Sequence, residues 1–245
     1  MNPVIVCGSG PSLAKVDVYA MQDHGIKICA VSTAIRYLYR PTGKKCRSRH
    51  FIGEFPDRHP DYWCIVDNVH GPHGEEGYMA AKDDRVKKVL PDNRKLMIDR
   101  FPGSNVELIR RKSCPPGKFM DETPCLIKKI NRSMPFAIEW LCKLTDHDVL
   151  IFAGVDLRID PDKPYVHDGR LRNKVGSKDQ QHSREFNIVK DWYPIAKDHG
   201  ITWLCWCDGS PMNTYMEPFN GRAESVGRPP WPAGKLSAVQ AGEKP

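Results

Sequence analysis

The sequence predicts an α/β protein with a Rossmann-like, mostly parallel sheet and helices on both faces. Two observations predict this fold. Short apolar runs of strand type alternate along the chain with segments of helical periodicity. The first of these runs, Val4–Cys7, ends directly in the turn Gly8-Ser9-Gly10, and Pro11 and Ser12 then restart the chain as a helix. A strand that turns through two glycines into a helix is typical of nucleotide-binding α/β domains, although a tight turn without a ligand has the same pattern.

The pattern along the chain predicts the order of the elements. Apolar runs predict strands over residues 3–7, 26–31, 62–67, 148–153 and 201–207, and shorter ones over 96–98 and 106–109. Helical periodicity and capping residues predict helices over 12–23, 32–39, 135–144 and 184–198. Segment 70–79 reads as a loop. Residues 158–181 predict a long polar lid loop, which is longer than packing alone usually requires.

Length and composition favour one soluble domain. The chain has 245 residues, of which 40% are hydrophobic, and no apolar run approaches the roughly 18–20 residues that span a bilayer. Its first residues lack the charged start and the apolar stretch of a signal peptide. We therefore expect a cytoplasmic α/β catalytic domain over 1–219, followed by a Pro/Gly-rich C-terminal segment over 220–245.

The nine cysteines predict reduced core thiols rather than a disulfide scaffold, because their number is odd and their spacing irregular. Those inside apolar runs are Cys7, Cys29, Cys64, Cys142 and Cys205. Cysteines and histidines also gather between residues 46 and 73, which leaves a zinc site there as an open alternative. No Cys-x-x-Cys pair is present, so we expect no metal.

The formal net charge of +7 suits a polyanionic partner such as nucleic acid, an anionic surface or nucleotide phosphates. Basic residues concentrate over 36–49, 110–112, 128–129 and 170–178. Solvated faces and loops would have the same composition. DNA is accordingly one candidate partner of a basic surface.

Polar residues follow the ends of several predicted strands. They are Gly8–Ser12, Ser32, Asp67, Asp156 and Asp208. Parallel strands end at one edge of a sheet, and ligands of such sheets bind beyond that edge. The sequence therefore predicts a nucleotide-type site at the carboxyl ends of the strands.

The segment around the lid loop carries candidate catalytic residues. His182 precedes Ser183, which is expected to cap the following helix, and a helix start would keep the imidazole a free base. His182 is thus a candidate general base, or else a surface histidine at a helix cap. Tyr165 could donate to a departing phosphate or pack the lid. Arg132 and Ser133 could clamp a phosphate, or form an N-cap with a solvated arginine.

Several segments, in this order, resemble the bacterial lipooligosaccharide sialyltransferases. They are Val-Cys-Gly-Ser-Gly-Pro-Ser-Leu at 6–13 with Asp17, Arg132-Ser133 before an apolar helix, Ile-Phe-Ala-Gly-Val-Asp-Leu at 151–157, Tyr165, His182-Ser183, and Trp-Leu-Cys-Trp-Cys at 203–207. The resemblance spans about residues 1–210 and leaves 70–125 unmatched. The Gly-x-Gly-Pro-Ser-Leu start is more distantly similar to archaeal pterin diphosphokinase-type proteins. A phage member of this group would fit the basic composition.

The resemblance implies inverting transfer of a sugar from a nucleotide-sugar donor on a Rossmann-like sheet, with no metal or other cofactor required. It implies that His182 deprotonates the acceptor hydroxyl and that Tyr165 holds the departing phosphate. Together with Arg132 of the clamp, the expected donor-binding residues are Gly8, Ser9, Gly10, Ser12, Ser32, Asp67, Asn68, Ser133 and Asp156.

The chain departs from the family at two places. Arg158 stands where the family has a second loop tyrosine, and Ser32 stands where it has an asparagine. A guanidinium holds phosphate charge better than a phenol, so Arg158 joins the catalytic candidates. These departures make glycosyl transfer in general a better expectation than sialyl transfer.

The leading hypothesis is a nucleotide-sugar glycosyltransferase whose acceptor is a hydroxymethylated base in DNA or a glycan. One alternative is a Mg²⁺-dependent pyrophosphokinase or nucleotidyl-type enzyme that uses Asp67, Asp156 and Asp208. Another is a non-catalytic protein that binds nucleotides or nucleic acid. The sequence leaves the oligomeric state open.

Overall fold

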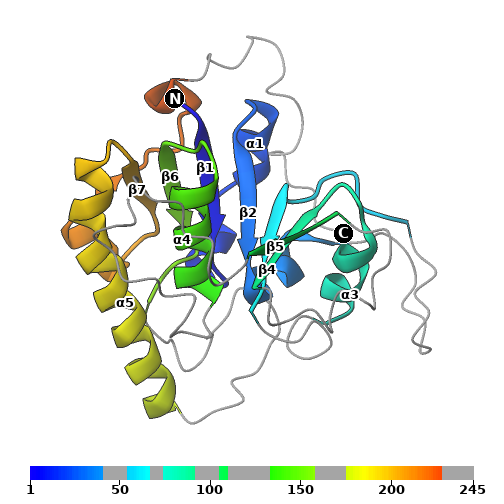
Figure 1. Ribbon diagram of the computed structural model, residues 1–245, viewed down its shortest axis with the longest axis horizontal. Coiled ribbons are helices and arrows are strands. Elements are labelled where there is room, and N and C mark those ends of the chain that lie inside the picture. The colour runs from blue at the N-terminus through cyan, green and yellow to red at the C-terminus, as the bar shows by residue number, and fades with distance from the viewer. Residues whose placement is uncertain (41–53, 67–73, 92–104, 110–132, 158–174, 228–245) are drawn as a thin grey trace, which may run out of the picture.

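The computed structural model describes residues 1–40, 54–66, 74–91, 105–109, 133–157 and 175–227, with side chains of the last range described from 185 onward. These residues form an α/β fold around one sheet of eight strands in the order β5-β4-β3-β2-β1-β6-β7-β8 (Figure 1). The strands are β1 Pro3–Cys7, β2 Lys27–Val31, β3 Tyr62–Cys64, β4 Lys87–Pro91, β5 Val106–Ile109, β6 Val149–Ala153, β7 Thr202–Trp206 and β8 Glu217–Pro218. All neighbouring strands in this order pair in parallel.

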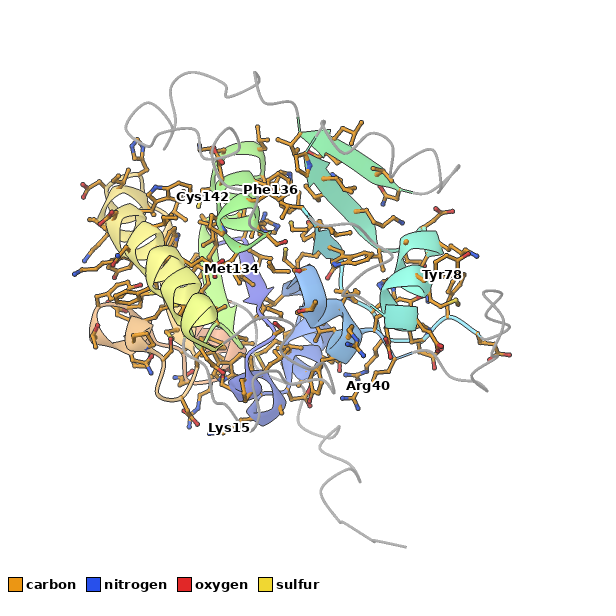
Figure 2. All side chains as sticks on the ribbon, turned by 90° about the horizontal axis from the view of Figure 1, so that it is seen from below. Lys15, Arg40, Tyr78, Met134, Phe136 and Cys142 are labelled. Atoms are coloured by element: carbon orange, nitrogen blue, oxygen red, sulfur yellow. The ribbon has the colours of Figure 1, made fainter. Side chains whose placement is uncertain are left out.

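The helices cover both faces of the sheet, as the sequence predicts. The α-helices are α1 Val18–Asp23, α2 Ile35–Leu38, α3 Gly74–Lys82, α4 Ser133–Leu144 and α5 Val175–Asp198. The 3₁₀ helices are η1 Pro11–Lys15, η2 Ser32–Ala34, η5 Pro211–Thr214 and η6 Ala223–Val226. Figure 2 shows α4 and α5 on one side of the sheet, and Lys15 and Arg40 on the opposite side.

Strand β1 shows why the sequence forms a buried central strand. Val4 and Val6 point into the core beneath α4 and α5, whereas Ile5 and Cys7 point into the core on the other face. All four side chains are fully buried. A strand buried on both faces reads as a continuous apolar run, which is the pattern that predicted it.

The order in which successive strands are added to the sheet reverses at β1. The strands that follow β1 in sequence extend the sheet through β2, β3, β4 and β5 on one side, and β6 then returns to pair with β1 on the other. The carboxyl ends of β1 and β6 therefore form the topological switch point of the sheet. Ligands of doubly wound sheets bind outside such a point, because the loops that leave the two strands diverge there.

Three predictions about local structure were wrong. The helix expected over 12–23 is two short helices, η1 and α1, separated at Val16 and Asp17, where Asp17 caps α1 by accepting from the N–H of Ala20. The loop expected over 70–79 contains most of α3. Strand β4 was missed because it carries Lys88, whose buried ammonium donates to the carbonyl of Asp83 over 2.8 Å.

The largest difference concerns the lid loop. Helix α5 begins at Val175, so residues 175–181 are helical and only 158–174 of the expected loop lie outside the described residues. His182 is consequently well inside the helix rather than at its start. The expectation that a helix N-terminus keeps this imidazole neutral was therefore wrong, because the field of a helix end falls off within the first turn.

For the cysteines within the described residues, the prediction of reduced core thiols is confirmed. Cys7, Cys29, Cys64, Cys142 and Cys205 are buried and free, as is Cys207. Beyond β8, Ala223 and Val226 are buried in the core on the α1 side, and Phe219 packs edge-on against Trp206 with ring centroids 5.1 Å apart. None of the helices in the described ranges combines the length and apolar character that a bilayer span requires.

Candidate functional site

The loops after β1 and β6 are in direct backbone contact at the switch point. The N–H of Gly8 donates to the carbonyl of Ala153 and the N–H of Gly10 donates to that of Gly154, each over 2.8 Å. Gly154 has φ +65°, and a Cβ there would meet the carbonyl oxygen of Gly8 at 2.5 Å. A Cβ on Gly10 would be 2.7 Å from the carbonyl oxygen of Gly154. Only glycine allows the two loops to approach this closely.

One carboxylate fastens the two loops together. Asp156 accepts from the N–H of Ser12 over 3.0 Å through Oδ2, and from the hydroxyl of Ser12 through Oδ1. Both side chains are buried. Hydrogen bonds to an ionised acceptor are roughly twice as strong as neutral ones. Asp156 therefore positions the glycine turn, and Ser12 uses both of its donors inside the protein.

The backbone donors of the turn are largely occupied. The N–H groups of Gly8, Gly10 and Ser12 are paired as above, and that of Leu13 donates to the carbonyl of Gly10 over 3.1 Å. Among the residues that the structure describes, neither the N–H nor the hydroxyl of half-buried Ser9 has a partner. Ser9 is thus the residue of this turn whose donors remain available to a ligand.

Residues that follow β7 also contact the loop after β6. The N–H of Val155 lies 3.2 Å from the sulfur of Cys207, and the hydroxyl of Ser210 donates to the carbonyl of Val155 over 3.0 Å. A hydrogen bond with Cys205, together with burial, raises the pKa of the Cys207 thiol well above its usual range. This shift favours the protonated thiol, which supports the loop through its contacts with the Val155 N–H and the Phe152 carbonyl.

Two residues at this edge have left-handed backbone conformations that side chains disfavour. Ser32, at the end of β2, has φ +50°, and Leu157, just after Asp156, has φ +51°. The carbonyl of Ser32 accepts from the indole N–H of Trp63 over 3.0 Å, which helps to hold this conformation. Each such residue costs of order 1–3 kcal/mol, and such strain concentrates at ligand sites. Both flank the switch point.

Ser133 begins α4 at the end of β3. Its hydroxyl lies 3.4 Å from the N–H of Val66 and its side chain is buried. This contact ties the start of α4 to the carboxyl edge of the sheet.

The structure brings together four of the sequence-predicted residues in direct contact at the switch point, namely Gly8, Gly10, Ser12 and Asp156, and places Ser9, Ser32 and Ser133 at the same edge. Asp67, Asn68, Arg132, Arg158 and Tyr165 lie outside the described residues. His182 is helical, but its side chain is not described. Figure 1 shows the first turns of α5 reaching past the carboxyl edge of the sheet.

Sequence reasoning missed Gly154, Leu157 and Ser210 as parts of this edge. A glycine directly after an apolar strand was a usable signal for Gly154, since such glycines often take positive φ. A left-handed leucine gives no sequence signal at all. In the described part of the chain, no three His, Cys, Asp or Glu side chains gather as metal ligands would.

Comparisons with known proteins found no matching family model and no matching curated protein. Among solved structures, the chain is similar to the sialyltransferase CstII from Campylobacter jejuni in complex with the substrate analogue CMP-3FNeuAc, with 16% identity over 89% of this chain and 86% of that chain and a TM-score of 0.45. It is also similar to the sialyltransferase CST-II in complex with a trisaccharide acceptor and CMP, with 14% identity over 88% and 85% and a TM-score of 0.44. At this identity and TM-score the likeness does not assign an activity to this chain.

Proposed function

We propose that this protein is a glycosyltransferase that moves a sugar from a nucleotide-activated donor to an acceptor hydroxyl. The observation that carries the proposal is the contact between Ser12 and Asp156 at the switch point. It fixes the glycine turn where a doubly wound sheet binds its ligand. The same residues belong to the ordered segments that resemble the sialyltransferases.

The donors and acceptors at this site favour a ligand rich in hydroxyl groups. Most backbone N–H groups of the turn are already paired, so the turn is not an empty phosphate cradle. Each carboxylate oxygen of Asp156 can accept more than one hydrogen bond, and both already face the turn. Ribose or sugar hydroxyls can donate to such a carboxylate, whereas a triphosphate is repelled by it. A nucleotide sugar fits these groups better than ATP does.

The proposed reaction follows from the residue types. The imidazole of His182 takes the proton of the acceptor hydroxyl, and the acceptor oxygen forms a bond to the anomeric carbon of the donor. The bond between that carbon and the phosphate oxygen breaks on the opposite side, which inverts the configuration. Tyr165 and Arg158 donate to the departing phosphate and stabilise its charge. The proposal requires neither a metal ion nor another cofactor.

The acceptor is a hydroxyl of a glycan or of a hydroxymethylated base in DNA. The net charge of +7 motivates DNA as a partner. DNA binding through backbone phosphates weakens steeply as salt rises, whereas glycan binding responds much less. Measuring the affinity for duplex DNA at two salt concentrations therefore separates the two acceptors.

The direct test is a thermal-shift panel of CMP, UDP, GDP and ADP, their common sugar conjugates, and ATP with and without Mg²⁺. We would begin with CMP and CMP-sugars, because the solved structures above contain CMP and CMP-3FNeuAc. Ligand at 100 times its dissociation constant adds about 2.7 kcal/mol of stability. Stabilisation by a nucleotide sugar in EDTA is expected. Stabilisation by ATP with Mg²⁺ alone would replace the proposal with phosphoryl transfer, and no stabilisation would favour a non-catalytic protein.

Substitution His182→Ala tests the proposed base. General-base catalysis contributes about 10²–10⁴-fold, so the transfer rate falls by that factor while donor affinity is retained. His199→Ala, just past the end of α5, is the matched control and leaves the rate unchanged. An undiminished rate in His182→Ala would remove this residue from the mechanism.

A further inference from the structure

A pocket of about 580 Å³ lies beside the switch point, on the α1 side of the sheet. Three segments far apart in the sequence line it: residues 14–19 after the glycine turn, residues 37, 38 and 40 at and just after the end of α2, and residues 56–58. Its volume falls in the range of small-ligand sites, about 300–1,000 Å³. Figure 2 shows Lys15 and Arg40, which belong to its lining, on the same side of the molecule.

The pocket and the switch-point site share η1 as a wall. Ser12 and Leu13 of η1 are buried, and Ser12 contacts Asp156. The exposed Ala14 and Lys15 of the same helix line the pocket. Lys15 also forms an exposed ion pair of 3.6 Å with Asp208, just beyond β7. A ligand in the pocket would therefore lie across η1 from a ligand at the switch point, close enough for one extended glycan to reach from the pocket to the donor.

Two arginines at the pocket are positioned by tyrosine rings. The guanidinium of Arg40 lies 4.5 Å from the centroid of the Tyr37 ring, and its Nε donates to the Tyr37 carbonyl over 3.1 Å. Arg58 lies 5.9 Å from the centroid of Tyr19 and pairs with Asp23 over 2.8 Å. Among the described residues Arg40 has no carboxylate partner, so both of its terminal nitrogens remain available. A stacked guanidinium with a free fork suits a carboxylate or a phosphate.

The rest of the lining does not suit a run of phosphates. Asp17 and Asp57 lie in the same pocket and would repel a polyanion, but they can accept from hydroxyl groups. Val16, Val18 and Leu38 supply apolar walls that suit the C–H face of a sugar ring. The lining thus suits a ligand with one anionic group, several hydroxyls and an apolar ring face, and an acidic sugar has all three.

We propose that this pocket binds an acidic sugar residue of the acceptor, with its carboxylate or phosphate on Arg40. The assignment as an acceptor pocket rests on the proposed glycosyl transfer, whereas the binding itself does not require it. The acceptor is then an acidic glycan, whose acidic residue is held by Arg40 while a neighbouring residue of the same glycan carries the reacting hydroxyl.

The test compares sugars that share a ring and differ in charge. Titration of the full chain with glucuronate, glucose 6-phosphate and glucose, followed by NMR chemical shifts, is run without any nucleotide sugar. We expect at least one of the two acidic sugars to bind about ten times more tightly than glucose, the strength of one hydrogen bond to a charged group. Preference for glucuronate identifies a carboxylate, and preference for glucose 6-phosphate identifies a phosphate.

The matched variants are Arg40→Gln in the pocket and Arg222→Gln, an exposed arginine before η6 that does not line it. Arg40→Gln lowers the affinity for the acidic sugar to that for glucose, and Arg222→Gln leaves it unchanged. Equal affinity for acidic and neutral sugars would overturn the proposal. It would also be overturned if neither acidic sugar bound and a DNA oligonucleotide did, with Arg40→Gln abolishing the binding of the DNA. Because no donor is present, a failure here is distinct from a failure of donor binding in the thermal-shift panel.

Discussion

Asp156 and Ser12, which are 144 residues apart in sequence, are joined by two hydrogen bonds at the switch point, where the strand order of the sheet reverses. The contact explains how the loop after β6 positions the loop after β1. It also holds the glycine turn in place before any ligand binds, because most of the turn's donors, other than those of Ser9, are used within the protein. Such preorganisation reduces the ordering cost of binding.

The first prediction concerns the strength of this contact. In a double-mutant cycle of Ser12→Ala and Asp156→Asn, we expect a coupling free energy of about 1.5–3 kcal/mol, because a charged acceptor is lost from a buried site. Urea unfolding of the four proteins measures it. Additive effects of the two substitutions would show that the carboxylate does not hold the turn.

The second prediction separates crowding from backbone strain. Gly10→Ala places a methyl group against Asp156 and the carbonyl of Gly154, so we expect nucleotide affinity to fall at least about tenfold. Gly25→Ala is the control. Its Cβ meets nothing within 4 Å, but its φ of +75° makes alanine cost about 1–2 kcal/mol of stability. Calorimetric titration should show weakened binding in Gly10→Ala alone, and equal weakening in both variants would contradict the assigned site.

The third prediction concerns the ion pair between Glu139 and Lys143 inside α4. Both side chains are almost completely buried, at 0% and 2% exposed. Lys143→Met takes the ion-pair partner of the Glu139 carboxylate away from a buried site, so it should lower the free energy of unfolding by about 3–5 kcal/mol. The double variant Glu139→Leu/Lys143→Met should recover most of this loss, as measured by urea unfolding. No recovery would mean that packing, rather than charge pairing, dominates there.

The fourth prediction is a pH dependence of stability at His147. Burial lowers its pKa, while a hydrogen bond to the Asn2 carbonyl and the neighbouring carboxylates of Asp146, Asp148 and Asp61 oppose the shift. The ring is 3.0 Å from the Asn2 carbonyl and 3.4 Å from the hydroxyl of Tyr62. The folded pKa lies below the unfolded value of about 6.5.

The unfolded chain therefore binds more protons in the window between those two pKa values. The contribution of His147 to stability is present above pH 6.5, and it decreases as pH falls from there toward the folded pKa. His147→Gln should remove this part of the pH dependence. Urea unfolding at several pH values from 7.5 downward checks it, and identical pH profiles of the two proteins would refute the assignment.

The sheet could be predicted from the sequence because its central strands are buried on both faces. The runs around Val4 and Ile151 have no polar interruption, and their loops begin with glycine. Strand β4 could not be predicted in this way, because Lys88 reads as exposed until the carbonyl of Asp83 is placed beside its ammonium. A local sequence pattern cannot show that a lysine will be buried when its hydrogen-bond partner is brought beside it only by the fold.

The site could be predicted in outline for the same reason. Gly8, Gly10 and Asp156 follow strand ends, so the parallel order of the sheet alone brings them to one edge. The pairing of Ser12 with Asp156 and the left-handed Leu157 depend on loop geometry that leaves no local signal. The start of α5 at Val175 was missed because the glycine and polar residues after it read as loop.

The most direct test of the proposed donor site is amide hydrogen exchange of the full chain with and without saturating CMP, UDP, GDP or ADP, in EDTA. We predict that at least one of these nucleotides slows exchange in the peptides that span 8–15 and 154–157, and leaves the peptide that spans 217–226 unchanged. If none of the four protects the two switch-point loops, the donor does not bind where Asp156 holds Ser12, and the proposed site is wrong.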